Sequence, residues 1–381
     1  MTTSTNNKGD GKFHFAIDRG GTFTDIFCRL PNGQEIVSKL LSEDPAHYPD
    51  APTEGIRRVL EEYDAPASGG ARSYPRTKPV ETSQIASIRM GTTVATNALL
   101  ERDGARMALL ITKGYGDVLE IGNQSRPDIF DLTCQKPSLL YERVVEVDER
   151  VVLSQFCPKS TSEYWKANPE FTGLTGEKVQ VLQEPNLEAI QKELETLRDA
   201  GITALAICLM HAYTFSAHEV AIGQVAEKMG CFSQISLSHQ VMPMVKLVSR
   251  GHTCCAAAYL TPKITTYLAS FKQGFDEDLS NGKVPLTFMK SDGGLAPDGG
   301  FGGHQAILSG PAGGVVGYAK TSFHDKDPTP CIGFDMVRIH DYLSFTLFFT
   351  FEKILTRSVI VFMFTLFSLT TGWNIHGCFS L

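Results

Sequence analysis

The segment Asp18–Asp25, Asp-Arg-Gly-Gly-Thr-Phe-Thr-Asp, restricts the fold of this chain more than any other. Apolar side chains alternate with other residues over 13–18, which predicts a strand. A second strand is expected over 24–30, a tight turn at 31–33 and a third strand over 34–41. The two glycines therefore lie in the turn of an antiparallel hairpin, where the backbone can come close to a ligand.

This hairpin turn has the composition of a phosphate-binding loop. Its backbone N–H groups can surround an anion, and its threonines add hydroxyl donors. The predicted ATP-binding residues of the loop are Gly20, Gly21, Thr22, Thr24 and Asp25. Asp18 ends the first strand, so we expect it to hold Mg²⁺ through water and to act in catalysis. A strand instead of a helix follows the glycines and Gly-Lys-Ser/Thr is missing, which excludes the Rossmann and Walker A motifs. A plain hairpin turn is the alternative.

Length and composition indicate a globular protein of two or three domains. The chain has 381 residues, a net charge of −7 and a pI of about 5.8. An acidic protein is a poor partner for nucleic acid, because phosphate backbones require a basic surface. The nine cysteines form no C-x-x-C pair, and their scattered placement is typical of reduced thiols in the cytoplasm (cytosol). The polar N-terminus lacks the apolar segment of a secretory signal.

Four regions follow from the pattern along the chain. We expect a disordered leader at 1–12, a mixed α/β domain at 13–235, the start of a second domain at 236–336 and a divergent apolar tail at 337–381. In the first domain, Pro52–Tyr63 predicts a helix with Thr53 as a cap. Another helix begins after Asn186 and ends at Gly201, and the apolar run Ala204–Met210 predicts a buried strand.

The last 45 residues differ from those before them. They contain eight of the 23 phenylalanines, and their apolar runs show neither helical nor strand periodicity. The run Ser358–Leu369 has 12 residues, against about 20 that cross a bilayer, so no membrane span is expected. We expect this tail to lower solubility, because exposed apolar segments favour aggregation.

Five ordered blocks resemble the hydantoinase A/oxoprolinase family. They are Phe15–Asp25, Arg89–Arg102, Arg126–Leu132, Val241–Thr253 and Ser309–Gly314. In that family, hydantoinases and acetone carboxylases usually carry His at the position of Met90, whereas the oxoprolinase branch carries Met. The resemblance runs from about residue 13 to residue 336 and is closest to the oxoprolinase branch.

The resemblance implies an actin-like (ribonuclease H-like) α/β ATPase fold with an N-terminal lobe and an incomplete second lobe. It implies ATP and Mg²⁺ as cofactors and hydrolysis of 5-oxo-L-proline to L-glutamate. The residues predicted to contact the substrate are Gly91, Thr92, Thr93, Asn97, Arg250 and His252, with Asp128 and Asp131 as further catalytic candidates. Gly310, Gly313 and Gly314 are predicted to bind the nucleotide. A helix cap at Thr93, a tight turn at 309–314, a solvated loop at 128–131 and a structural His252 are the alternatives.

The chain departs from the family pattern after Met336. Gly333-Phe334-Asp335-Met336 begins a second phosphate motif, which predicts Asp335 as a metal ligand, but Val337-Arg338-Ile339 follows in place of Gly-Gly-Thr. We therefore expect an incomplete form of the enzyme. An ATP-dependent hydantoinase or acetone carboxylase subunit and a non-catalytic binding protein are the other hypotheses. The composition leaves a homo-oligomer open.

Overall fold

A computed structural model describes residues 11–64, 73–123, 130–131, 133–134, 136–156 and 169–321, together with the backbone of four C-terminal strands. The chain forms two compact units. The first comprises 1–101, 264–301 and 305–381, and the second comprises 102–263 and 302–304. The predicted domains at 13–235 and 236–336 follow chain order, whereas the compact units do not, because the chain leaves the first unit and returns to it.

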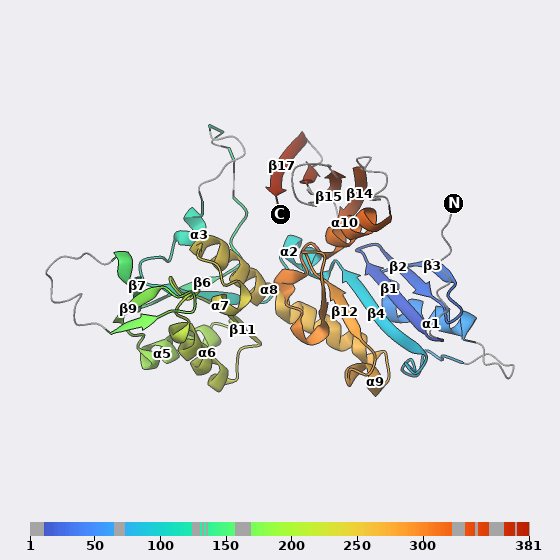
Figure 1. Ribbon diagram of the computed structural model, residues 1–381, viewed down its shortest axis with the longest axis horizontal. Coiled ribbons are helices and arrows are strands. Elements are labelled where there is room, and N and C mark those ends of the chain that lie inside the picture. Colours follow the sequence, from blue (N-terminus) through green and yellow to red (C-terminus); the bar gives the residue numbers. More distant parts are fainter. Residues whose placement is uncertain are drawn as a thin grey trace. The chain divides into compact units, whose positions relative to one another are not determined.

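The first unit is built on a six-stranded mixed sheet (Figure 1). Its strands, in spatial order, are β13 (Leu295–Pro297), β12 (Leu286–Met289), β4 (Ile85–Thr92), β1 (Phe13–Arg19), β2 (Phe23–Arg29) and β3 (Glu35–Leu41). The meander β1–β2–β3 is antiparallel, whereas β4 runs parallel to both β1 and β12. The predicted hairpin is therefore confirmed, and β4 adds the parallel neighbour that brings a distant segment to its turn.

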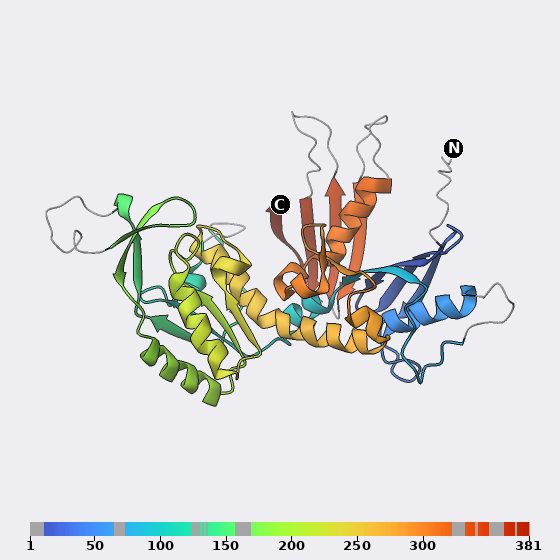
Figure 2. The ribbon, with the colours of Figure 1, turned by 60° about the horizontal axis from the view of Figure 1, so that its bottom comes forward.

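Helices cover this sheet (Figure 2). Helix α1 (Ala51–Tyr63) packs against β1, β2 and β3, and α10 (Ser309–Thr321) packs against β4 and β12. The N-cap of α1 is Asp50, whose carboxylate accepts from the Thr53 backbone N–H at 2.9 Å. The predicted cap at Thr53 is wrong, since Pro52 already occupies a helical position in the first turn, where its missing N–H costs nothing. The unit also contains α2 (Val94–Leu100) and α9 (Glu277–Ser280).

The second unit is a parallel α/β sheet with a small antiparallel sheet. The parallel strands are β11 (Gln234–Leu237), β10 (Ala204–Cys208), β5 (Met107–Thr112) and β6 (Arg143–Val147), in that order. The antiparallel strands are β7 (Arg150–Leu153), β9 (Lys178–Gln183) and β8 (Glu170–Thr172). The buried strand predicted at 204–210 is confirmed as β10, whose five residues are all buried.

The helices of the second unit include α5 (Leu187–Asp199) and α6 (Ala217–Met229), which pack together. Asn186 caps α5 by accepting from the Ala189 backbone N–H at 3.0 Å, as the sequence predicts. Gly201, with φ of 79°, follows the helix in the left-handed region. The short helices are α3 (Val118–Ile121) and α7 (Ser238–Val241), and the long helix α8 (Leu247–Gln273) contributes its residues up to Lys263 to this unit.

The tail forms two antiparallel hairpins. One pairs β14 (Ile332–Ile339) with β15 (Tyr342–Phe349), and the other pairs β16 (Phe362–Leu369) with β17 (Gly372–Ser380). The sequence shows no strand periodicity in the apolar runs of this tail, yet the structure forms strands there. Alternation marks a strand only when one face is polar, and β15 and β16 are apolar at most positions, although their aromatic and branched residues favour strands.

The first prediction concerns the packing of Gly55 in α1. A Cβ at this position would lie 2.5 Å from Cγ1 of Ile26, so the helix could not keep its distance from the sheet. We expect Gly55→Ala to lower the free energy of unfolding by about 1–3 kcal/mol, although alanine normally favours a helix.

Gly317→Ala in α10 is the matched control. A Cβ there meets nothing within 4 Å, so the same exchange should be neutral or stabilising by up to about 1 kcal/mol. Urea denaturation of both variants measures the difference. Equal effects at the two positions would contradict the close packing of α1.

Candidate functional site

The hairpin turn between β1 and β2 forms the centre of the site. Asp18 lies opposite Asp25 in the register of the two strands, and the Gly20 backbone N–H donates to the Phe23 carbonyl at 3.0 Å. A Cβ at Gly20 would lie 2.9 Å from that carbonyl oxygen, so glycine is required for the turn to close. Gly21 and Thr22 at the tip are exposed, and neither is among the residues that line the cavity described below.

Ser42, which the sequence analysis missed, braces this turn from the end of β3. Its hydroxyl donates to the Gly20 carbonyl at 2.7 Å and lies 2.9 Å from the hydroxyl of Thr24. Its backbone N–H donates to the Thr22 carbonyl at 2.9 Å. Thr24 is fully buried, so the structure gives its hydroxyl an internal partner at a position predicted to bind phosphate.

The second glycine block lies directly beside the first. In the parallel pair β1–β4, Asp18 is level with Gly91, and a Cβ at Gly91 would lie 3.0 Å from Oδ1 of Asp18. Thr93 donates to the Arg19 carbonyl from its backbone N–H at 3.1 Å and from its hydroxyl at 3.3 Å. Thr93 is the N-cap residue of α2, but its side chain forms no cap hydrogen bond. Its hydroxyl serves the contact with β1 instead.

The third block, Ser309–Gly314, forms the start of α10 and not a tight turn. The buried Ser309 hydroxyl donates to the Thr92 carbonyl at 2.9 Å, and the Thr96 hydroxyl donates to the Ile307 carbonyl at 2.5 Å. These two hydrogen bonds join α10 to the second block. Three segments far apart in sequence therefore meet at one end of the sheet.

These segments line a cavity of about 570 Å³ in the first unit. The predicted site residues among its walls are Asp18, Asp25, Gly91, Gly310, Gly313 and Gly314. Phe27, Val37, Met289 and Leu295 form an apolar part of the wall. A cavity lined by carboxylates, glycine backbone and apolar side chains suits a ligand that is part polar and part apolar.

The glycines of α10 are not required by protein packing. A Cβ at Gly313 would have no neighbour closer than 3.9 Å, and one at Gly310 would have none closer than 4.0 Å. Glycine costs a helix about 1 kcal/mol relative to alanine. Their presence on the cavity wall is therefore consistent with close approach of a ligand to the helix backbone.

The acidic groups of this unit fit a weakly held Mg²⁺ better than a metal cage. Within the described residues, no cluster of three or more His, Cys, Asp or Glu side chains could hold a metal ion. Mg²⁺ commonly takes one or two carboxylates and completes its shell with water and phosphate. Asp18 lines the cavity, while Asp25 pairs with Lys39 at 3.1 Å. Asp335 lies in β14, of which the structure describes the backbone, so its predicted metal role stays a prediction.

The predicted acidic pair at 128–131 is described in part. Asp128 lies outside the described residues. Asp131 belongs to the second unit, and its Oδ1 accepts from the Thr133 backbone N–H at 2.8 Å and from the Thr133 hydroxyl at 2.6 Å. This local turn gives Asp131 a structural role, and a catalytic role remains a prediction.

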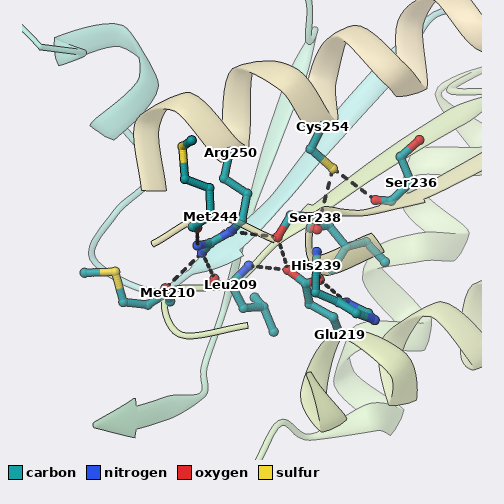
Figure 3. A network of polar contacts seen from close by, with 10 residues as sticks. Leu209, Met210, Glu219, Ser236, Ser238, His239, Met244, Arg250 and Cys254 are labelled. Carbon is teal, nitrogen blue, oxygen red and sulfur yellow. Dashed lines mark hydrogen bonds and ion pairs between the residues drawn. The ribbon is translucent and has the colours of Figure 1, made fainter. Parts of the chain in front are cut away.

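Arg250 of α8 is completely buried in a polar network of the second unit (Figure 3). Nε donates to the Ser238 hydroxyl at 2.9 Å, and that hydroxyl donates to Oε1 of the buried Glu219 at 2.6 Å. The terminal nitrogens donate to the backbone carbonyls of Leu209, Met210, Met244 and Val245. The chain itself therefore engages all five N–H donors of Arg250. They join α8 to the ends of β10 and β11, and substrate binding by Arg250 remains a prediction.

His252 and the cysteines next to it lie in the same helix. Partial burial of the His252 ring, together with the nearby Lys136 ammonium, lowers its pKa, so the ring is neutral at pH 7. A neutral ring can form a hydrogen bond with a substrate but cannot neutralise its charge. Cys254 and Cys255 are buried, and burial raises the pKa of both thiols, which makes them poor nucleophiles.

Residues 14–230 match the family model described as Hydantoinase/oxoprolinase N-terminal region. Residues 250–336 match the model described as Hydantoinase/oxoprolinase. The chain belongs to the hydantoinase/oxoprolinase family.

Similar members of this family carry the name 5-oxoprolinase. 5-Oxoprolinase 1 of Arabidopsis thaliana is 52% identical over 328 residues, which cover 86% of this chain and 25% of the relative. The 5-oxoprolinase of Dictyostelium discoideum is 47% identical over 84% of this chain and 26% of its own length. The 5-oxoprolinase of Saccharomyces cerevisiae is 45% identical over 86% of this chain and 25% of its own length. The chain thus spans about a quarter of the length of these relatives.

Two solved structures of family enzymes share the fold. The ATP-dependent caprolactamase from Pseudomonas jessenii has a TM-score of 0.63 and 22% identity, and nucleotide-free acetone carboxylase has a TM-score of 0.62 and 19% identity. Each match covers 88% of this chain and 43% of the other. The predicted actin-like α/β fold class is confirmed. Within the described residues, no helix combines the length and apolar character needed to cross a membrane.

Removal of the Ser42 hydroxyl tests whether its hydrogen bonds stabilise the loop. In Ser42→Ala, the buried Thr24 hydroxyl and the Gly20 carbonyl lose a partner, which should lower the free energy of unfolding by about 1–3 kcal/mol. Amide hydrogen exchange at Gly20, whose N–H donates to the Phe23 carbonyl, should accelerate. Ser38→Ala, an exposed change in β3, which ends one residue before Ser42, is the control and should alter neither quantity. An unchanged exchange rate in Ser42→Ala would contradict a stabilising role of the Ser42 hydroxyl in the turn.

Proposed function

We propose that this chain provides the nucleotide-binding part of an ATP-dependent 5-oxoprolinase, which hydrolyses 5-oxo-L-proline to L-glutamate with formation of ADP and phosphate. The supporting observation is the single cavity lined by Asp18, Gly91 and Gly313, in a chain 45–52% identical to proteins named 5-oxoprolinase in a plant and a yeast. A cytosolic location, a part in glutathione turnover and self-association belong to the same proposal.

ATP is needed because a five-membered lactam is an unreactive amide whose ring closure competes with hydrolysis. Phosphorylation of the amide oxygen makes the carbon electrophilic and supplies a leaving group, so that water can then open the ring. The protein has to position the reactants and neutralise phosphoryl charge. In this chain, the turn Gly20–Thr22 would supply backbone N–H donors, and Asp18 would orient Mg²⁺ through water.

Further predicted residues of the first unit have a place in this proposal. Gly310, Gly313 and Gly314 would let the nucleotide approach α10, and Gly91 would let the ligand approach β4 next to Asp18. Thr92 and Thr93 would act through backbone position, since Ser309 and Arg19 already contact them. Asp335 would serve as a second carboxylate for the metal.

An ATP-dependent hydantoinase or acetone carboxylase subunit is the second candidate, because acetone carboxylase shares the fold. Met90 argues against it, since those enzymes usually carry His at this position. In this chain, the Met90 sulfur contacts the Tyr267 hydroxyl at 3.2 Å in the core. A non-catalytic protein that retains nucleotide binding is the third candidate, and 5-oxoproline-dependent ATP hydrolysis distinguishes the three.

Gly313→Leu separates nucleotide binding from folding. A Cβ at this position meets its nearest protein atoms, in Met289, at 3.9 Å, so the new side chain starts without a clash and the melting temperature should change little. The same side chain would occupy the space proposed for ATP, and we expect at least roughly 100-fold weaker ATP binding by calorimetry, more than one lost hydrogen bond would cause.

Gly317→Leu is the matched control, because Gly317 lies in the same helix but not on the cavity wall. It should bind ATP as the unchanged chain does. Full ATP affinity in Gly313→Leu would place the nucleotide elsewhere and refute the assignment of this cavity.

Asp18→Asn tests the metal role. The Asp18 side chain is exposed at the end of β1, so the melting temperature should change little, whereas the dependence of ATP affinity on Mg²⁺ should disappear. Glu35→Gln, an exposed carboxyl change at the far end of β3, should preserve that dependence. A variant that keeps its Mg²⁺ dependence would exclude Asp18 as the metal residue.

A further inference from the structure

Arg19 occupies an unusual position next to the proposed phosphate loop. Successive strand residues point to opposite faces, so Asp18 lines the cavity while Arg19 points to the other face of the sheet. There its guanidinium carbon lies 5.2 Å from the ring centroid of Tyr267 in α8. Its Nε is buried and has no hydrogen-bond partner among the described residues. A buried guanidinium donor without an acceptor is rare, because the loss of hydration is not compensated.

Asn97 of α2 presents the complementary group. Its Oδ1 is also buried without a partner among the described residues. Asn97 lies four residues after Thr93, so the two side chains project from the same face of the helix start, and the Thr93 hydroxyl contacts the Arg19 carbonyl. This hydrogen bond holds the face of α2 that carries Asn97 next to the end of β1. An unpaired donor and an unpaired acceptor thus stand on two segments that are hydrogen-bonded to each other.

The aromatic contact holds Arg19 in place while leaving its donors available. The Tyr267 hydroxyl is occupied by the Met90 sulfur, and burial raises the pKa of Tyr267, so the ring stays neutral and offers the guanidinium its face. Arg19 and Asn97 each keep part of their surface exposed, although Nε and Oδ1 themselves are buried. Because Arg19 directly precedes Gly20, a ligand bound by Arg19 would lie next to the loop.

We propose that Arg19 and Asn97 form the recognition site for a cyclic amide that carries a carboxylate. Arg19 donates to the carboxylate, and Oδ1 of Asn97 accepts from the ring N–H. This inference rests on the proposed function, since 5-oxo-L-proline has both groups, and it deepens that function by assigning the substrate contacts to two residues of the first unit. Arg250, which the sequence analysis predicts to contact the substrate, is then not needed for the carboxylate.

The arrangement explains how the site would select its substrate. A guanidinium forms paired hydrogen bonds with a carboxylate, and a site built around such groups rejects analogues that leave them unpaired. A lactam without the carboxylate would leave Arg19 unpaired. A lactone with the carboxylate would leave Oδ1 of Asn97 facing a ring oxygen, which is an acceptor facing an acceptor.

The test uses the full 381-residue chain and three ligands of similar shape. These are 5-oxo-L-proline, 2-pyrrolidinone, which lacks the carboxylate, and 5-oxotetrahydrofuran-2-carboxylate, which has oxygen in place of the ring N–H. Binding is measured by ligand-observed NMR, and ATP binding with Mg²⁺ is measured by calorimetry on the same samples.

Arg19→Met should weaken 5-oxo-L-proline roughly 10- to 100-fold, the effect of one lost hydrogen bond to a charged group, and leave 2-pyrrolidinone unchanged. Arg19→Lys should restore part of the affinity, because lysine keeps the positive charge but lacks the paired N–H donors of the guanidinium. Arg29→Met, at the opposite end of the hairpin, is the control and should bind like the unchanged chain.

Asn97→Leu should weaken both lactams but not the lactone. Its melting temperature should be equal or higher, because the exchange removes a buried acceptor without a partner; a purely structural Asn97 would give the opposite result. Asn281→Leu, at an exposed helix end, is the control.

The inference is overturned if the unchanged chain does not bind 5-oxo-L-proline, if Arg19→Met weakens all three ligands equally, or if Asn97→Leu does not distinguish lactam from lactone. The proposed function fails separately if the chain binds 5-oxo-L-proline through these residues but binds no ATP. Bound ATP without bound 5-oxo-L-proline would refute the inference and leave the nucleotide site intact.

Discussion

The parallel pairing of β1 with β4 is the contact on which the candidate site depends. It sets Asp18 level with Gly91 and Arg19 level with Thr92, so the two glycine blocks end at the same edge of the sheet. Thr93 then locks α2 to the Arg19 carbonyl, and Ser309 locks α10 to the Thr92 carbonyl. A register shift of one residue would turn every side chain of β4 to the other face and separate these groups.

Buried polar groups of this chain fall into two kinds. Arg250, Ser238 and Glu219 satisfy one another and the ends of two strands, which stabilises one arrangement of the second unit. Nε of Arg19 and Oδ1 of Asn97 have no partner among the described residues, as is also true of Nδ1 of His211 in the second unit, although burial makes this costly. Natural proteins tolerate such violations mostly where a ligand completes the structure.

The glycines of the site follow two separate physical requirements. Gly20 is needed because the turn leaves no room for a Cβ, and Gly91 because Asp18 stands against it. Gly310 and Gly313 have free space around them and lower the stability of their own helix. The first two therefore maintain the loop, whereas the latter two keep the cavity wall open. The glycines of the three blocks thus serve different purposes, and substitutions at them should not be treated as equivalent.

Local patterns in the sequence were sufficient to predict the β1–β2–β3 meander, helix α5 with its Asn186 cap, the buried strand β10 and the Gly-Gly turn, because each depends on neighbours a few residues apart. Periodicity did not reveal β15 and β16 of the tail, because these strands are apolar at most positions and leave little alternation to detect. Ser42 could have been found by counting the hairpin register from the turn at 31–33, which places it beside Thr22. Three features could not have been predicted from the sequence. They are the convergence of Gly91 and Gly313 on one cavity, the burial of Arg250, and the unpaired groups of Arg19 and Asn97. All three result from the pairing of β1 with β4 and the packing of α8 and α10. Contacts between residues tens to hundreds of positions apart leave no periodic trace in a single sequence, and only the folded chain decides them.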